Sequence, residues 1–430
     1  MNSAGPGKSG LDLVPFRGVR YVPERVGSLA AVTSPPYDVV VRPDGLLHLE
    51  SADPHNIVRV ILPQGESAEL RHRHAADTLR GWLAEGVLAA DGTPALYVYE
   101  QRRGDLLQRG VIGALRLSEP SEGVVLPHED VIQDVVADRA DLMRATAANL
   151  EPLLLTYRGD EPGAEEVPAA GTAAVVESVA ATPPLLATVT EDGFAHRLWA
   201  VRDPEDIAEV RADLSHRQAL IADGHHRWAT YLRLREGRPS PSPWDYGLVL
   251  LVDTVRHPLR VRAIHRLLRG LPVGRALRLL GDTFRVREVP GPLAEAERAL
   301  AGAAAGGNAF LLAGDGRFHL VDRPAPALLA RTVPSDRPPA WRSLDATVLH
   351  SALIAEVWSL PDSSERIAYL HEADAAVEQA VRTDSTAVLM HPVAESVVRD
   401  LAGAGVRMPR KSTSFGPKPA TGLVLRDLDL

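Results

Sequence analysis

Hydrophobic and polar positions along the chain follow two alternating patterns, which together predict an α/β protein. Short hydrophobic runs that are typical of buried strands alternate with segments whose hydrophobic residues recur at helical spacing. Two pairs of strand-like runs, 95–100 with 110–117 and 185–189 with 195–200, are each joined through turn-forming residues and predict hairpins. Because hairpins bring antiparallel strands together, we expect α/β (α+β) architecture with mixed sheets rather than one purely parallel sheet.

Helices and strands are predicted along nearly the whole chain. Residues 57–62 read Ile-Val-Arg-Val-Ile-Leu and predict a strand, whereas 66–85 predict a long helix with one hydrophobic face. The Gly-, Ala- and Pro-rich residues 159–184 contain a helical patch with loose flanks. Further helices are expected at 134–150, 204–214, 293–304, 344–358, 373–381 and 392–402, and further strands at 153–157, 246–252, 261–265, 309–312, 318–321 and 387–390.

The length of 430 residues is sufficient for two or three domains with a large core. Residues 1–10 are rich in glycine and serine, and we expect this N-terminus to be disordered. We place the main domain at 11–266 and a smaller C-terminal α/β domain at 267–430. Five prolines within 322–339 indicate a linker or an edge loop in that second domain.

Composition and charge narrow the classes of function. The net charge of −9 argues against general nucleic-acid binding, so we expect no DNA or RNA partner. The absence of cysteine excludes disulfides, thiolate catalysis and zinc ribbons. The start of the chain lacks the apolar core of a secretion signal, and no apolar run approaches the roughly 20 residues of a membrane span. We therefore expect a cytoplasmic protein without a membrane partner, and abundant Arg, Ala, Gly and Pro with scarce Lys indicates a bacterial source.

The segment 219–235 carries the densest group of candidate functional residues. A short apolar run ends at Asp223-Gly224, and helical spacing begins at His225, so the pattern predicts a strand, a tight turn and a helix. Backbone N–H groups and the positive end of the macrodipole at such a helix start suit a phosphate. Arg227 could form a fork with phosphate oxygens. Asp223 could cap the helix, hold a metal or take a proton; the alternative is a capped helix with two surface histidines.

Other polar motifs supply weaker candidates. Asp38 follows two prolines, which place it on a rigid loop, and Glu129 follows Pro-His in a second loop. The tail 408–418 packs three cations and three hydroxyl side chains into eleven residues, which suits phosphates. Each motif also has a purely structural interpretation, as a turn or a basic tail. The Arg-His-Arg-His run at 71–74 is interpreted as a solvated helix face. His265 and Arg266 either line the site or belong to the core.

Six motifs are spread along nearly the whole chain. They are Val14-Pro-Phe-Arg-Gly-Val-Arg20, Ser34-Pro-Pro-Tyr-Asp-Val39, Pro127-His-Glu129, Ile221-Ala-Asp-Gly-His-His-Arg227, Ala263-Ile-His-Arg266 and Met408-Pro-Arg-Lys-Ser-Thr413. Together they resemble a bacterial and archaeal family, domain of unknown function 1015, and the tail motif is then expected to fold back onto the main domain. The segment from Asp223 to Arg227, with Ala229 after it, also resembles a turn of the ParB/sulfiredoxin superfamily and of its free serine kinases, which have Thr at the position of His226.

The resemblance implies a ParB/sulfiredoxin-like nucleotide-binding centre and a phosphotransferase that acts on a small hydroxyl compound, possibly free serine. Its cofactors would be ATP or ADP with Mg²⁺. No Walker sequence and no His-Arg-Asp loop of the common kinases is found. On this hypothesis we expect Lys411 to lie near Arg227. The proposed catalytic residues are Asp223, Asp38, Glu129 and His226; the proposed nucleotide-binding residues are Gly224, His225, His226, Arg227, Lys411, Ser412, Thr413 and Lys418; the proposed metal ligand is Asp223.

Two other functions stay open at this point. The first is a ParB-like nucleotide-binding switch or adaptor without catalysis, although no basic recognition helix is evident. The second is a metal-dependent hydrolase that uses Asp223, His225, His226 and His128. Adjacent helical residues project about 100° apart, so the two histidines could hardly bind one ion from a regular helix. The identity of the nucleotide and of the acceptor, and the oligomeric state, are left open by the sequence.

Overall fold

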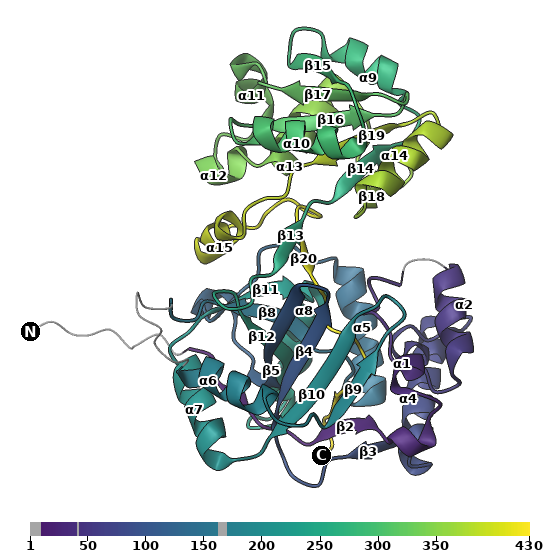
Figure 1. The fold of residues 1–430 in the computed structure, drawn as a ribbon, viewed down its shortest axis with the longest axis vertical. Helices are drawn as coiled ribbons and strands as arrows, with labels where there is room; N and C mark the ends of the chain where they lie inside the picture. The colour runs from purple at the N-terminus through teal and green to yellow at the C-terminus, as the bar shows by residue number, and fades with distance from the viewer. Residues whose placement is uncertain (1–9, 41–42, 162–169) are drawn as a thin grey trace, which may run out of the picture. The chain divides into compact units, whose positions relative to one another are not determined.

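The computed structural model describes residues 10–40, 43–161 and 170–430, so the expected disorder of the N-terminus falls almost entirely outside the described residues. The chain forms two compact units. Unit 1 comprises Met1–Pro127, Val131–Leu259 and Pro417–Leu430, and unit 2 comprises His128–Asp130 and Arg260–Gly416. Each unit has its own large sheet covered by helices (Figure 1).

The largest sheet of unit 1 is mixed, as the hairpin patterns predict. Its described part has nine strands, in which β11 is parallel to β6, β12 is parallel to β8, and the other pairs are antiparallel. Both predicted hairpins, β4–β5 and β9–β10, are confirmed. The strand order is β6 (Val125–Leu126), β11 (Ala219–Asp223), β8 (Leu153–Tyr157), β12 (Tyr246–Asp253), β5 (Leu106–Arg116), β4 (Leu96–Arg103), β10 (Ala195–Val201) and β9 (Leu186–Val189), with β1 (Leu13–Val14) paired to β5.

Helices and a second sheet complete unit 1. The helices α6 (Gly171–Ala180) and α7 (Pro204–Leu214) lie side by side (Figure 1) and share one hydrophobic core with the large sheet. The helix α5 (Gln133–Thr146) packs against both α4 (Ala68–Ala84) and α8 (His225–Arg235). The second sheet has the order β3 (Leu88–Ala90), β2 (Gly18–Tyr21), β21 (Leu425–Asp427) and β7 (Ala148–Asn149), and the short helices are α1 (Leu29–Val32), α2 (Pro43–Ala52) and α3 (Val58–Ile61).

The predicted strand at 57–62 is wrong, because this segment forms the short helix α3. The Asn56 side chain starts the turn: its Oδ1 accepts a hydrogen bond from Val58 N at 2.9 Å, and its Nδ2 donates to Ala31 O at 2.7 Å. Val58, Val60 and Ile61 are all buried, so the segment does not alternate between a buried and an exposed face. A short apolar run in which most residues are buried has no clear period by which a strand and a helix can be distinguished.

Unit 2 is a three-layer α/β structure. Its sheet has the order β15 (Arg285–Val289), β17 (Phe318–Asp322), β16 (Ala309–Ala313), β19 (Thr386–Met390), β14 (His265–Leu268) and β18 (Ile367–Leu370), with antiparallel neighbours throughout. One face packs on α10 (Leu293–Ala304) and α14 (Ala373–Arg382), in front of the sheet in Figure 1. The other face packs on α9 (Val273–Leu280), α11 (Pro326–Thr332), α13 (Asp345–Val348) and the π-helix Leu349–Val357.

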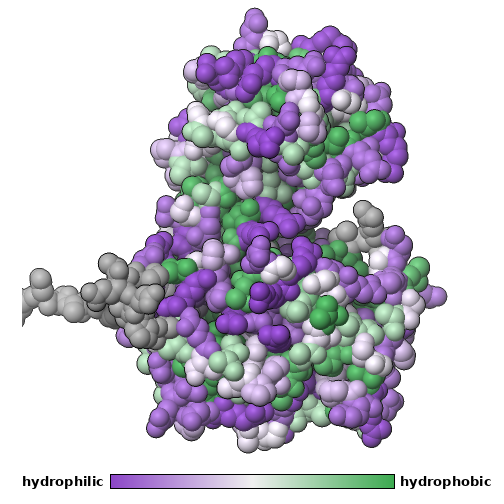
Figure 2. Space-filling view, in the orientation of Figure 1, coloured by the Kyte–Doolittle hydropathy of each residue, from purple (hydrophilic) through white to green (hydrophobic). Residues whose placement is uncertain are grey.

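Smaller elements of unit 2 connect its tail to the rest of the unit. The strand β13 (Arg260–Arg262) pairs with β20 (Ser414–Gly416), and α12 (Pro339–Arg342) packs against α15 (Glu395–Gly403). On the face shown in Figure 2, each unit has a largely hydrophilic surface with scattered hydrophobic residues. Among the helices that the structure describes, none combines the length and the hydrophobicity needed to cross a bilayer.

Candidate functional site

The turn between β11 and α8 has the strand, turn and helix arrangement expected from the sequence. Gly224 adopts a left-handed conformation, with φ +98°, and is the N-cap residue of α8. A Cβ atom at Gly224 would lie 2.9 Å from Leu153 Cγ and 3.2 Å from Arg227 Nη2. Glycine is therefore needed both for the backbone conformation and for the close approach of neighbouring side chains. Since Gly224 is the N-cap, Asp223 does not cap the helix, and that interpretation of Asp223 is wrong.

Asp223 is instead oriented by a buried arginine one helical turn later. Its Oδ2 accepts a hydrogen bond from Arg227 Nη2 at 2.8 Å. Arg227 is only 5% exposed, and its Nη1 also donates to Pro152 O at 3.2 Å. Burial acts to lower the pKa of Arg227, but the carboxylates of Glu151 and Asp223 outweigh it and hold the pKa above its ordinary value. Arg227 thus points into unit 1, where it holds Asp223 in one orientation.

Glu151 joins three segments that carry candidate residues. Its Oε1 accepts hydrogen bonds from Tyr37 N at 3.0 Å and from Thr421 Oγ1 at 3.3 Å. Its Oε2 lies 3.9 Å from Arg227 Nη1. Burial raises the pKa of Glu151, and the charge of Arg227 opposes that rise. Glu151 is not among the residues predicted from the sequence, because a Glu-Pro pair after a helix has no spacing that indicates chemistry.

Lys418 connects the two candidate carboxylates of unit 1. Its Nζ contacts Asp223 Oδ1 at 2.5 Å and also bonds to Asp38 Oδ2. The Lys418 and Asp223 side chains are 20% and 12% exposed, while the Asp38 side chain is 37% exposed. Burial acts to lower the pKa of Lys418, but Asp223 and Asp38 outweigh it and raise the pKa above its usual range. The ammonium is therefore charged, and a half-buried cation lies beside two carboxylates at the start of α8.

Only three of the 47 basic residues in the sequence are lysines, at positions 8, 411 and 418. All the other basic residues are arginines. A lysine ammonium is a compact charge with three donors, whereas a guanidinium is a wider planar fork. The contact of Lys418 with one oxygen on each of two carboxylates suits the compact group.

Tyr37 covers the buried end of the Arg227 side chain. The Arg227 Cζ lies 5.8 Å from the Tyr37 ring centroid, and Arg139 Cζ lies 4.7 Å from the same centroid. Burial raises the pKa of Tyr37 to about 12, so its hydroxyl is neutral at physiological pH. The aromatic ring and its two cations thereby fix the loop that presents Asp38.

His226 joins the starts of two helices. Its Nε2 accepts a hydrogen bond at 3.1 Å from the backbone N–H of Ile132, which is the N-cap residue of α5. His225 is the first residue of α8. The positive ends of the α5 and α8 macrodipoles therefore lie close together, which increases the positive potential available to an anion.

Four of the predicted site residues, Glu129, Lys411, Ser412 and Thr413, belong to unit 2. The Pro-His-Glu and tail motifs come together there, because Glu129 forms a parallel bridge with Met408, and His128 Nε2 lies 2.9 Å from Thr413 Oγ1. Lys411 has φ +59°, an uncommon conformation for a residue with a side chain. The expected proximity of Lys411 to Arg227 involves residues of different units and stays a prediction.

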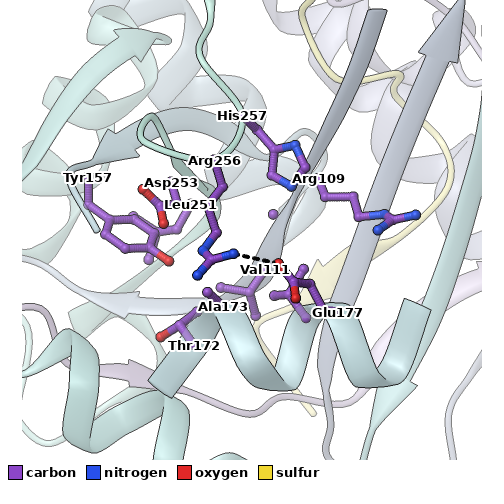
Figure 3. A pocket seen from close by; sticks show the side chains of 12 residues that line it. Arg109, Val111, Tyr157, Thr172, Ala173, Glu177, Leu251, Asp253, Arg256 and His257 are labelled. Atoms are coloured by element: carbon purple, nitrogen blue, oxygen red, sulfur yellow. Dashed lines mark hydrogen bonds and ion pairs between the residues drawn. The ribbon is translucent and has the colours of Figure 1, made fainter. Parts of the chain in front are cut away.

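A pocket of unit 1 lies at the carboxyl ends of β8 and β12, away from Asp223; Figure 3 shows the side chains that line it. Its lining includes Tyr157 and Asp253, the last residues of β8 and β12, whereas Asp223 pairs near the start of β8. Its charged groups are bonded within the protein: Arg256 Nη1 donates to Glu177 Oε1 at 2.8 Å, Asp253 Oδ1 accepts from Gly159 N at 2.8 Å, and Arg109 Nε donates to Glu100 Oε2 at 2.5 Å. These groups are already satisfied within the protein, and the pocket lies at the other end of β8 from Asp223.

Within residues 10–40, 43–161 and 170–430, no group of three or more His, Asp or Glu side chains is arranged to hold a metal ion. The metal-dependent hydrolase considered above would require such a group.

Comparisons with known proteins place the chain in a family. No curated protein matches the sequence. Similar solved structures include a free serine kinase in complex with AMP (16% identity, TM-score 0.33, covering 68% of this chain and 83% of that chain). Others are a conserved hypothetical protein from Pyrococcus furiosus (15%, 0.33, 68% and 87%) and SbnI with a C-terminal truncation from Staphylococcus aureus (7%, 0.34, 71% and 82%). The sequence model of the family described as protein of unknown function (DUF1015) matches residues 13–347, well over half of the chain, and the chain therefore belongs to this family.

Proposed function

We propose that this protein binds ATP or ADP at the turn between β11 and α8 and transfers a phosphoryl group to a small hydroxyl compound, with free serine as the first acceptor to test. The observation that carries the proposal is the position of Lys418 Nζ between Asp38 and Asp223 at the start of α8. Phosphoryl transfer depends mainly on positioning and on cations that neutralise phosphate charge. This group of residues offers both, together with carboxylates that can orient a hydroxyl.

The backbone of the turn would hold the phosphates. The first N–H groups of a helix have no acceptor within the helix, and the left-handed Gly224 forms the tight turn that leads into the first turn of α8. Lys418 would neutralise phosphate charge from the side of the two carboxylates. Arg227 is buried and bonded to Asp223, so it would act by holding that carboxylate in place.

The carboxylates of Asp223 and Asp38 would orient the acceptor hydroxyl and accept its proton. The two groups contact a common cation, so their oxygens face the same small volume. Mg²⁺ usually takes one or two carboxylates together with phosphate oxygens, and Asp223 would be its protein ligand. When bound there, Mg²⁺ would supply further neutralisation of the phosphates.

The remaining candidates would contribute around this centre. His225 and His226 start α8, and Glu129, Lys411, Ser412 and Thr413 are proposed to add phosphate and acceptor contacts from unit 2. We place the protein in the bacterial cytoplasm, where nucleotides and free amino acids are both abundant. No nucleic-acid partner is proposed, because the net charge is −9.

The test uses Asp223→Asn and a matched control, Asp213→Asn. Asp213 pairs with Arg217 at the same i,i+4 spacing, at 2.5 Å, and its side chain is 15% exposed against 12% for Asp223. Nucleotide binding is measured by calorimetric titration with ATP, ADP and CTP, with and without Mg²⁺, and transfer is measured with serine and related alcohols. We expect Asp223→Asn to abolish transfer while retaining nucleotide binding, and Asp213→Asn to retain both.

Two outcomes would contradict this proposal. Full transfer activity in Asp223→Asn would remove the carboxylate from the mechanism. Failure of the wild-type protein to bind any of the three nucleotides would remove the site itself. Nucleotide binding without transfer to any acceptor would instead support a non-catalytic, ParB-like switch.

A further inference from the structure

A row of buried polar side chains crosses the large sheet of unit 1. His196 on β10 is directly opposite Gln101 on β4, and Gln101 is directly opposite Gln108 on β5. Tyr99 lies two residues before Gln101 and therefore on the same face of the sheet. All four side chains belong to residues that are at most 3% exposed. Burying polar groups is costly unless they are hydrogen-bonded, so the hydrogen-bond partners of these side chains indicate what the row holds in place.

The row binds the segment that carries Lys418. The Nε2 atoms of Gln101 and Gln108 both donate to Pro417 O, at 3.1 and 3.2 Å. The Tyr99 hydroxyl oxygen accepts from Ala420 N at 3.1 Å. The two anchored backbone groups thus lie on either side of Lys418.

The Tyr99 hydroxyl is part of a series of hydrogen bonds in which the donor of each bond can be assigned. Thr190 Oγ1 donates to Asp192 Oδ1 at 2.6 Å, so it accepts from His196 Nε2 at 2.9 Å. His196 Nδ1 is then the unprotonated nitrogen and accepts from the Tyr99 hydroxyl at 2.8 Å. Burial lowers the pKa of His196 to about 4, in agreement with a neutral ring. With its hydrogen donated to His196, the Tyr99 oxygen is oriented to accept from Ala420.

The backbone around Lys418 is restricted by its own sequence as well. Pro417 and Pro419 flank Lys418; proline fixes its own φ and disfavours helical conformations of the residue before it. Beyond them, Thr421 and Ser34 form a two-bond bridge at 2.8 and 3.1 Å. Lys418 therefore extends from an anchored backbone toward Asp38 and Asp223, which limits the volume that its ammonium can reach.

We propose that Tyr99, Gln101 and Gln108 are positioning residues that fix Pro417–Ala420 so that the Lys418 ammonium stays between Asp38 and Asp223. Their placement of Lys418 is a property of unit 1 by itself. Their effect on phosphate binding rests on the proposed function above, and the two are measured separately.

The experiment compares Tyr99→Phe with Tyr97→Phe. Tyr97 is also buried on β4, on the same face, but its hydroxyl accepts from Gly18 N at 2.9 Å and donates to Asp91 Oδ2 at 2.6 Å, so it does not contact the Lys418 segment. Each variant loses one buried hydroxyl and keeps its ring. Amine labelling with acetic anhydride, followed by mass spectrometry, gives a separate rate for each lysine, with Lys8 and Lys411 as internal references.

We expect Tyr99→Phe to raise the relative labelling rate of Lys418 about fivefold, the factor that corresponds to one hydrogen bond of about 1 kcal/mol. Tyr97→Phe is expected to leave that rate unchanged while lowering the melting temperature to a similar extent. If Tyr99→Phe does not fold, Gln108→Met, which removes a donor to Pro417 O, is measured in its place. Equal labelling of Lys418 in the control and in the test variant would overturn the proposal.

A second readout connects positioning with function. The dissociation constant for ATP should rise in Tyr99→Phe by the same factor as the Lys418 labelling rate, and it should be unchanged in Tyr97→Phe. If wild-type protein binds no ATP, the proposed function fails while the labelling result still decides the positioning role. If ATP binds equally well to both variants although Lys418 labels faster in Tyr99→Phe, Lys418 is positioned as proposed but does not contact the nucleotide.

Discussion

At the scale of single residues, the identity of the cation at position 418 can be tested directly. Lys418 places one ammonium against two carboxylates, whereas a guanidinium needs a planar, wider arrangement of acceptors. We expect Lys418→Arg to keep the chain folded and to weaken ATP binding about tenfold. The guanidinium would place its N–H donors differently from the ammonium, and the loss of a charge-assisted hydrogen bond to the phosphates costs roughly 1.5 kcal/mol of binding free energy. Calorimetric titration measures the change. Unaltered affinity would mean that any positive charge at this position suffices.

At the scale of the element, the β11–α8 turn depends on Gly224. An alanine there meets two penalties: a left-handed backbone costs roughly 1–2 kcal/mol, and a Cβ only 2.9 Å from Leu153 Cγ adds overpacking of about 1–3 kcal/mol. A substitution at Gly86 measures the backbone penalty by itself, because Gly86 also has positive φ, +72°, but no atom lies within 4 Å of an added Cβ. We expect Gly224→Ala to lower the free energy of unfolding of unit 1 by more than Gly86→Ala, as measured by urea denaturation. Equal losses would show that Leu153 moves aside without cost.

At the scale of the whole molecule, the sequence predicts the elements better than the interactions that join distant segments. The β11–α8 turn and both hairpins are recognisable because glycine and hydrophobic period act locally. The helix at 58–61 is missed because three of its four residues are buried, and such a short run has no clear period. The roles of Glu151, Gln101 and Gln108 are seen only in the folded unit 1, where these side chains form hydrogen bonds with residues 417–421. Such pairings, between residues 270 to 316 positions apart, leave no local signal in a single sequence.

The acid stability of the molecule should depend on histidines that are buried in a neutral form. Burial lowers the pKa values of His196, His265 and His350 to about 4. Between pH 6.5 and 4 the unfolded chain therefore binds more protons than the folded chain, so stability is present above the unfolded pKa and is lost as the pH falls. Each such histidine contributes a slope of up to about 1.4 kcal/mol per pH unit in this window.

His350 provides the cleanest test of that dependence, because it lies outside the proposed site and the polar row. We expect His350→Gln to flatten the dependence of the free energy of unfolding on pH between 6.5 and 4, since glutamine cannot gain the proton in the unfolded chain. The contributions of the carboxylates are common to both proteins and cancel in the difference. His48→Gln, at a side chain that is 59% exposed, serves as the control. Identical slopes for wild type and His350→Gln in urea titrations at several pH values would show that His350 is not held neutral by the folded chain.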